Sequence, residues 1–141
     1  MNKNGPILII EDDIDDREFI QSAYKKLDYT NELVFLDSGE IAIQYLLAMK
    51  KIPFLIISDL NMPKINGIEL RDRVRQNEAI KLKCVPYIIF STTVAKNFID
   101  DAYLIGIQGY FKKPVKQHEL VSIFKHIIDY WKVSYTPGMY M

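Results

Sequence analysis

The sequence has little of what secreted and membrane proteins contain. It holds one cysteine, Cys84, so no disulfide can form within the chain, which favours a reducing, cytoplasmic environment. No apolar run approaches the roughly 20 residues that span a bilayer. The first residues, Met1 to Pro6, are not followed by the apolar segment and cleavage site of a signal peptide. We therefore expect no association with a membrane.

An excess of charge of one sign is also missing. Eighteen basic residues balance eighteen acidic ones, whereas binding of nucleic acid through a positive field needs a clear surplus of lysine and arginine. We therefore expect no nucleic-acid partner. The chain has 141 residues, 49% of them hydrophobic, which suits one domain with a full core. We expect that domain over residues 1–133 and an irregular tail over 134–141, with nothing left for an output domain.

The apolar residues follow two alternating patterns. Continuous apolar runs predict strands at 7–10, 33–36, 54–57, 87–90 and 110–111, and the run at 7–10, rich in β-branched residues, predicts a strand buried on both faces. Apolar residues three or four positions apart predict amphipathic helices around 19–27, 42–49, 68–74, 98–105 and 116–132. Asp37 and Glu40 resemble a capping box at the start of the second helix.

This order of strands and helices predicts an α/β fold. Strict alternation implies a parallel sheet with helices on both faces, and right-handed crossovers leave few arrangements of the strands. We expect the flavodoxin-like (βα)5 doubly wound sheet with strand order 2-1-3-4-5.

Polar residues follow four of the predicted strands. They are Glu11, Asp12 and Asp13, then Asp59, then Ser91, Thr92 and Thr93, and finally Lys112 and Lys113. The carboxyl ends of parallel strands lie along one edge, where ligands bind. Clustered carboxylates repel unless a cation neutralises them, and Mg²⁺ prefers such oxygen ligands. Lys113 and Ser91 supply the positive charge and the hydroxyl that a phosphoryl group needs. With one carboxylate as the nucleophile, the residue types predict a Mg²⁺-dependent aspartyl-phosphate site.

Taken in order, these residues resemble the receiver domain of two-component response regulators. The resemblance covers about residues 6–132 and is carried by Glu11-Asp12, Asp59-Leu60-Asn61-Met62-Pro63 with Gly67, Ser91, and Tyr110-Phe111-Lys112-Lys113-Pro114. The chain looks like a stand-alone, chemotaxis-regulator-like member. The stretch from Asn77 to Val85, followed by Pro86, resembles the longer connection after the third helix in the stand-alone regulators paired with bacterial phytochromes.

The resemblance implies how phosphate and metal are bound. Asp59 would accept a phosphoryl group from a phosphohistidine on a histidine kinase or a histidine phosphotransfer protein. Asp12, Asp59 and the backbone carbonyl of Asn61 would bind Mg²⁺ directly, and Glu11 would act largely through metal-bound water.

The resemblance also implies a switch. Lys113 would pair with the phosphoryl oxygens, and Ser91 would hydrogen-bond one of them. Tyr110 would turn inward when Ser91 moves, changing the face made by the helix around 98–105, the strand at 110–111 and the helix at 116–132. That face would bind an unidentified downstream protein or a second copy of the chain. A cis peptide bond between Lys113 and Pro114, which X–Pro bonds permit, would aim the lysine inward.

Two other functions share this chemistry or this fold. A small Mg²⁺-dependent phosphohydrolase would use the same nucleophile but needs a second acid, typically two residues on, where this chain has Asn61. A flavodoxin-like FMN carrier would share the sheet, but acidic residues after the first strand do not suit a phosphate cradle. We therefore expect a phosphoaccepting signalling module, not an enzyme, that catalyses only its own phosphorylation and dephosphorylation.

Several residues have plainer interpretations. Asp13 is expected at the start of the first helix, and His118 and His126 on the surface, without ligand spacing. Cys84 is expected to be a buried small hydrophobe. The apolar end of the last helix, which includes Trp131, fits either packing against the tail or a dimer surface.

Overall fold

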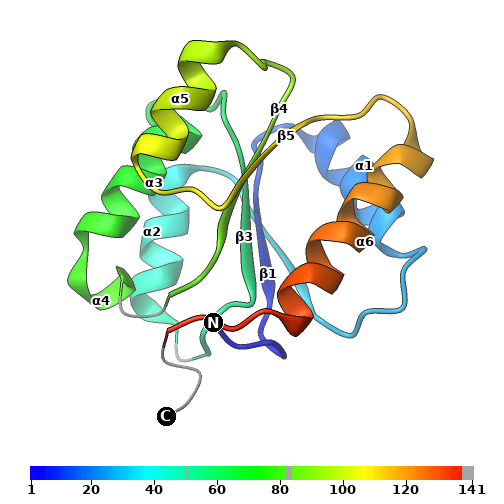
Figure 1. Cartoon of the computed structure of the whole chain (residues 1–141), viewed down its shortest axis with the longest axis horizontal. Helices are drawn as coiled ribbons and strands as arrows, with labels where there is room; N and C mark the ends of the chain where they lie inside the picture. Colours follow the sequence, from blue (N-terminus) through cyan, green and yellow to red (C-terminus); the bar gives the residue numbers. More distant parts are fainter. Residues whose placement is uncertain (50, 82–83, 138–141) are drawn as a thin grey trace.

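The chain forms a five-stranded parallel sheet with helices on both sides (Figure 1). The computed structural model describes residues 1–49, 51–81 and 84–137; the last four residues of the predicted tail, 138–141, lie outside the described residues. The strands are β1 (Ile7–Ile10), β2 (Leu33–Leu36), β3 (Leu55–Asp59), β4 (Tyr87–Ser91) and β5 (Gly109–Lys112). Their order is 2-1-3-4-5, so the predicted flavodoxin-like sheet is confirmed.

Six helices are found in the described residues, one more than predicted. They are α1 (Ile14–Tyr24), α2 (Gly39–Ala48), α3 (Gly67–Gln76), α4 (Glu78–Lys81), α5 (Lys96–Leu104) and α6 (Gln117–Val133). The additional helix, α4, lies in the connection from Asn77 to Pro86, of which residues 82–83 are outside the described residues. It has only four residues, too few to leave an amphipathic pattern in the sequence. None of the described helices combines the length and the apolar composition of a membrane-spanning segment.

Two apolar layers fill the space on either side of the sheet. Successive side chains of a strand point to opposite faces, so Leu8 and Ile10 pack in one layer and Ile7 and Ile9 in the other. Figure 1 shows α2, α3 and α5 over one face and α1 and α6 over the other. All residues of β1 and β4 are buried, which explains why these strands appear in the sequence as continuous apolar runs.

The first two helices begin at side-chain caps. Asp13 caps α1, as expected. The cap of α2 is Ser38, whose hydroxyl accepts a backbone hydrogen bond at 3.2 Å, so the predicted capping box led by Asp37 is wrong. Asp37 lies one residue before the cap and pairs with Arg17 of α1 instead.

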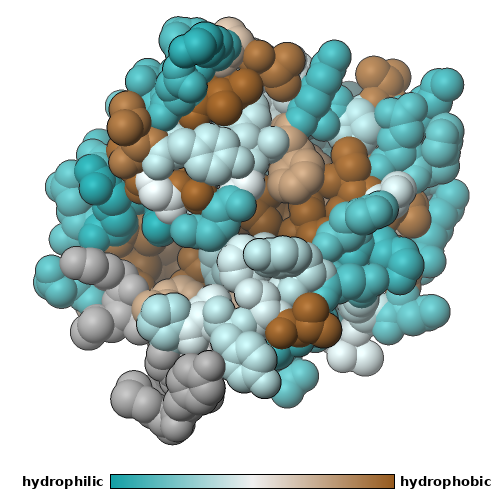
Figure 2. All heavy atoms as spheres, in the orientation of Figure 1, coloured by the Kyte–Doolittle hydropathy of each residue, from teal (hydrophilic) through white to brown (hydrophobic). Residues whose placement is uncertain are grey.

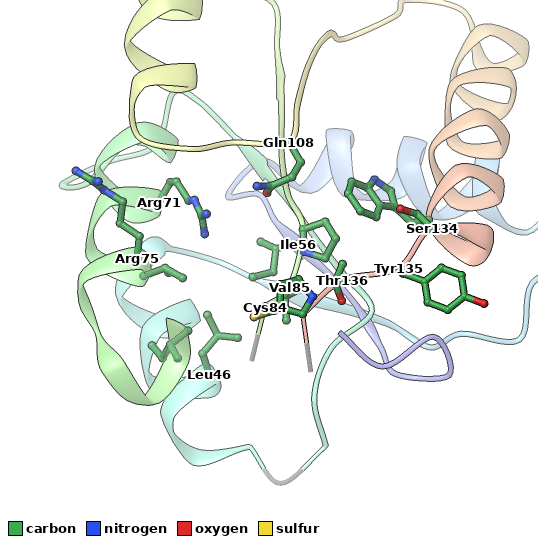
Figure 3. A pocket seen from close by; sticks show the side chains of 15 residues that line it. Leu46, Ile56, Arg71, Arg75, Cys84, Val85, Gln108, Ser134, Tyr135 and Thr136 are labelled. Atoms are coloured by element: carbon green, nitrogen blue, oxygen red, sulfur yellow. The ribbon is translucent and has the colours of Figure 1, made fainter. Parts of the chain in front are cut away.

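The apolar end of α6 faces both inward and outward. Ile127 and Ile128 are buried, whereas Tyr130 is 62% exposed. Trp131 is half-buried and lines, together with tail residues 134–137, a cavity of about 460 Å³ at the amino ends of the strands (Figure 3). Trp131 therefore lies next to the tail, whereas the side chain of Tyr130 is exposed to solvent.

Candidate functional site

The ends of β1 and β3 bring three carboxylates together. These strands are neighbours in the sheet, with Ile10 opposite Ser58, so the residues that follow lie side by side. Oxygens of Glu11, Asp12 and Asp59 all lie within 4.8 Å of one another. Oxygen ligands of this kind suit Mg²⁺ and other hard divalent cations, and groups this close can share one ion. The donor set therefore fits the predicted metal.

Lys113 brings a positive charge to the same place. Its backbone N–H donates to the carbonyl of Ser91 at 2.9 Å, which continues the pairing of β4 with β5 by one residue. Its Nζ lies 2.7 Å from Glu11 Oε1, 2.9 Å from Asp16 Oδ2 and 3.3 Å from Asp59 Oδ2. Lys113 thus joins the carboxylates in one charged cluster.

The peptide bond between Lys113 and Pro114 is trans, as are all peptide bonds of the described residues, so the expected cis bond is wrong for this structure. The backbone hydrogen bond to Ser91 fixes the direction of the chain at residue 113. From there, the long lysine side chain reaches the carboxylates without a cis bond.

Burial and pairing have opposite effects within the cluster. Burial raises the pKa of Glu11 above its ordinary value because a low-dielectric environment disfavours the carboxylate, although the hydrogen bond from Lys113 acts the other way. Burial alone would lower the pKa of Lys113, but its hydrogen bonds to Glu11 and Asp16 and the charge of Asp59 raise the pKa overall. Lys113 is therefore a cation at neutral pH beside a buried carboxyl group.

Two hydroxyl side chains meet beside this cluster and hold the loop between β4 and α5. Ser91 is fully buried, and its Oγ accepts a hydrogen bond from the backbone N–H of Thr93 at 3.0 Å. Tyr110, half-buried on β5, donates its hydroxyl to the carbonyl of Thr93 at 2.5 Å. Burial raises the pKa of Tyr110, and a hydrogen bond with Ser91 partly offsets this. Thr93 links both predicted switch residues to the segment before α5, and nothing in the sequence pattern distinguishes it from its neighbours.

The loop after β3 lies against Asp59 because of a glycine. The N–H of Gly67 donates to the carbonyl of Leu60 at 2.9 Å, and a Cβ at Gly67 would lie 2.3 Å from the carbonyl oxygen of Asp59. Only glycine permits so close an approach. Asn61 is exposed in this loop, with its side-chain nitrogen 3.5 Å from Thr93 Oγ1.

Asp16 belongs to the charged cluster, although it was not among the predicted site residues. The residues four and seven positions later, Ile20 and Ala23, are buried on the inner side of α1. Asp16 therefore continues the inward-facing stripe of the helix by one turn, to the level where it meets the polar edge of the sheet. That periodicity was the signal that could have identified it.

The remaining candidates lie outside the cluster. His118 and His126 are exposed, as predicted. Cys84 is half-buried rather than buried, at a backbone φ of 49°.

The fold and the site together define a class of protein, an α/β domain whose sheet edge combines clustered carboxylates with a lysine and a hydroxyl. A family model described as the response regulator receiver domain matches residues 7–125. The chain therefore belongs to the response regulator receiver domain family, the signalling modules of two-component systems, and the resemblance identified from the sequence is confirmed.

Individual relatives agree with this assignment. The chain is 27% identical over 135 residues to response regulator Rcp1 of Synechocystis sp., covering 92% of this chain and 90% of that protein. It is 31% identical over 115 residues to the chemotaxis protein CheY-3 of Vibrio cholerae, covering 81% and 84%.

Solved structures give the same result. The phosphorylated cyanobacterial phytochrome response regulator RcpA superposes with a TM-score of 0.81 at 28% identity, covering 94% of this chain and 98% of that one. The Mn²⁺-bound form of Rcp1 superposes with a TM-score of 0.77 at 26% identity, covering 92% and 96%.

Proposed function

We propose that this chain is a response regulator receiver domain that accepts a phosphoryl group on Asp59 from a phosphohistidine of a histidine kinase or a histidine phosphotransfer protein. The observation that carries the proposal is the position of Asp59, 3.3 Å from Lys113 Nζ and within 4.8 Å of the carboxylates of Glu11 and Asp12. In the transfer, a carboxylate oxygen of Asp59 attacks phosphorus and the P–N bond breaks. The histidine nitrogen leaves with the electron pair of that bond. Such a transfer depends mainly on positioning and charge neutralisation, which this cluster supplies.

The residues present also fit a divalent cation. Asp12, Asp59 and the backbone carbonyl of Asn61 would hold Mg²⁺ directly, with Glu11 acting through metal-bound water. The bound ion supplies charge neutralisation and orientation of the phosphoryl oxygens. Support comes from the close carboxylate oxygens and from the structure of Rcp1 with Mn²⁺. Lys113, whose Nζ lies 3.3 Å from Asp59 Oδ2, would pair with the phosphoryl oxygens.

Ser91 and Tyr110 pass the change on to the surface. Both bond the backbone of Thr93, at the start of the α5 region. When Ser91 donates its hydroxyl to a phosphoryl oxygen, the hydrogen bonds around Thr93 rearrange and Tyr110 turns inward. The phosphoryl group thereby biases a small two-state element, and the α5–β5–α6 face changes its affinity for a partner.

The α5–β5–α6 face has the apolar surface that a protein partner needs. Four side chains in and before α5 are substantially exposed, namely Val94 (48%), Phe98 (36%), Tyr103 (50%) and Leu104 (80%). A cavity of about 550 Å³ lies between β5 and α6, beside Phe111 and Tyr130. Figure 2 shows apolar side chains gathered at the centre of this face with polar side chains around them. The partner is a downstream protein or a second copy of the chain, in the cytoplasm.

The phosphohydrolase alternative has less support. It needs an acid near the nucleophile, and the residue two positions after Asp59 is Asn61, whose amide cannot donate a proton to a leaving group as a carboxylic acid does.

The experiment is phosphorylation in solution. The chain is incubated with Mg²⁺ and acetyl phosphate, and intact-mass spectrometry is used to count added phosphoryl groups. We expect one group on the wild type and none on Asp59→Asn. Asp12→Ala should lose Mg²⁺ binding in a titration. A folded, Mg²⁺-binding wild type that reacts with neither acetyl phosphate nor beryllofluoride would refute the proposal.

A further inference from the structure

Lys113 is held from three directions by carboxylates. An ammonium group has three N–H donors, and Nζ of Lys113 lies within 3.3 Å of carboxylate oxygens of Glu11, Asp16 and Asp59. The contacts with Glu11 (2.7 Å) and Asp16 (2.9 Å) are hydrogen bonds, whereas the contact with Asp59 is longer, at 3.3 Å. Two partners therefore fix the ammonium group, and its third direction leads to the residue proposed to accept phosphorus.

The two fixing carboxylates belong to one rigid unit. The backbone N–H of Asp16 donates to Oδ1 of the helix cap Asp13 at 3.1 Å. The following residue, Arg17, donates from Nε to the carbonyl of Glu11 at 2.7 Å, which ties the start of α1 to the end of β1. Ile20, one turn further along α1, is buried in the core. Asp16 thus has a fixed position relative to Glu11.

We propose that Asp16 is a positioning residue, which together with Glu11 orients the ammonium group of Lys113 so that its remaining N–H faces Asp59 and the phosphoryl group received there. The inference rests on the proposed function of Asp59. A phosphoryl group on Asp59 takes the third direction of the ammonium group and displaces neither Glu11 nor Asp16. Asp16 acts through Lys113 and does not touch the phosphoryl group.

A purely stabilising ion pair would behave differently. The side chain of Asp16 is 45% exposed, and exposed ion pairs add little to stability. Removing its charge should therefore leave the fold intact. The side chain of Lys113 is only 18% exposed, so a change in its partners alters a largely buried group whose direction matters for transfer.

Besides orienting Lys113, the negative charge of Asp16 affects how a phosphoryl donor binds, and the two effects can be measured separately. A negative charge near Asp59 repels an anionic phosphoryl donor, and removing it would lower the donor concentration that gives the half-maximal rate. Loss of orientation lowers the rate at saturating donor instead. Measuring the two parameters independently distinguishes electrostatic repulsion from positioning.

The test compares Asp16→Asn with Asp15→Asn. Asp15 is the adjacent exposed residue in the same first turn of α1, so its substitution removes the same charge from the helix start without touching Lys113. With acetyl phosphate and Mg²⁺, we expect Asp16→Asn to lower the saturating rate about threefold to tenfold, since small misplacements are costly in transfer reactions. Asp15→Asn should keep the wild-type rate. Asp16→Glu, which restores a carboxylate, should recover most of it.

A second measurement does not need phosphorylation. In heteronuclear NMR, a lysine ammonium group held by hydrogen bonds exchanges slowly and gives a signal, which is assigned through its loss in Lys113→Ala. We expect this signal in the wild type and in Asp15→Asn, and expect it to broaden or vanish in Asp16→Asn. If the wild type cannot be phosphorylated, the proposed function fails while the ammonium signal still tests the positioning.

Two outcomes would overturn the inference. One is an Asp16→Asn chain that matches Asp15→Asn in both saturating rate and ammonium signal. The other is an Asp16→Asn chain with a higher saturating rate, which would mean that Asp16 competes with the phosphoryl group for Lys113. Should Asp16→Asn fail to fold, the rate and the ammonium signal of Asp16→Glu, compared with the wild type, decide the question.

Discussion

The two helices that flank β5 are attached to the core to very different degrees. The longer one, α6, buries Leu120, Phe124, Ile127 and Ile128, whereas α5 buries only Ala102. Burial of apolar side chains is the main stabilising contribution to a fold, and regions with few buried contacts open or move at lower cost. The helix after β5, α6, is therefore held by the apolar core. The helix before β5, α5, depends more on hydrogen bonds such as those around Thr93.

The polar contacts follow the same division. Lys113, which enters the charged cluster, precedes α6, while Thr93, which bonds both Ser91 and Tyr110, precedes α5. Lys113 thus reaches the charged cluster from the firmly packed side, and Thr93 bonds Ser91 and Tyr110 on the lightly packed side. This separation suits the proposed switch, in which the chemistry stays constant while the surface changes.

The largest expected effect tests the packing difference directly. Phe124→Ala, in α6, should lower the free energy of unfolding by about 3–5 kcal/mol, because a buried aromatic ring is replaced by a cavity. Phe98→Ala in α5, where the ring is 36% exposed, should cost less than about 1 kcal/mol. Urea denaturation of both variants gives the comparison. Equal losses would show that α5 is packed as firmly as α6.

The second effect concerns the charge on the α6 side. Lys113→Ala removes the cation beside Asp59 and should lower the initial rate of phosphorylation by acetyl phosphate about 100-fold, as loss of a transition-state donor typically does. Mg²⁺ binding should persist, because the carboxylate oxygens remain. The matched control is Lys112→Ala, which removes an exposed neighbouring lysine. Similar rates for both variants would contradict a specific role for Lys113.

A smaller effect is expected on the α5 side. Tyr110→Phe removes the hydrogen bond to the carbonyl of Thr93, which should cost about 0.5–1.5 kcal/mol. Amide hydrogen exchange should become faster in α5 but not in α6, while the rate of phosphorylation stays near that of the wild type. Tyr103→Phe, which alters an exposed tyrosine of α5, serves as the control. Faster amide exchange in both α5 and α6 would contradict the idea that α5 is held more weakly than α6.

The smallest effect lies on the outer side of α6. The hydroxyl of Tyr29 donates to Asp129 Oδ1 at 2.5 Å, and burial together with this bond raises the pKa of Tyr29 in the folded protein. A raised folded pKa gives a stabilisation that is present below the unfolded value of about 10 and is lost as pH rises above it.

Asp129→Asn should lower the pKa of Tyr29, measured by the ultraviolet absorbance of the phenolate, and reduce this alkaline loss of stability. Asp28→Asn, which alters the exposed residue next to Tyr29, should leave both unchanged. An unaltered titration of Tyr29 in Asp129→Asn would show that burial alone sets its pKa.

Particular elements show where prediction from the sequence succeeded. β1 and β4 are buried on both faces, so their continuous apolar runs were unambiguous. The residues after β1, β3 and β5 lay at one edge because parallel strands all end on the same side. The cluster of Glu11, Asp12, Asp59 and Lys113 could therefore be predicted without coordinates.

The sequence pattern did not predict where a helix begins, whether a very short helix forms, or which helix faces are covered. The cap of α2 is Ser38 rather than Asp37 because the helix begins one residue later than the capping-box spacing indicated. Helix α4 has only four residues, which is too short for an amphipathic repeat to be recognised in the sequence. The helix at 98–105 was predicted with an apolar inner face, but only Ala102 is buried there, because spacing shows which residues share a side and not whether anything covers it.

The sequence alone determined the order of the strands, the sheet, and the choice of Asp59 as the proposed phosphoacceptor, because strand ends and residue chemistry are local properties carried along the chain. Only the tertiary structure showed that Asp16 is a partner of Lys113 and that the backbone of Thr93 bonds both Ser91 and Tyr110. Asp16 bonds the lysine across 97 positions of the sequence. Such contacts depend on how α1 is seated on the sheet, and a difference of one turn or a few ångströms there changes the partner without changing the pattern.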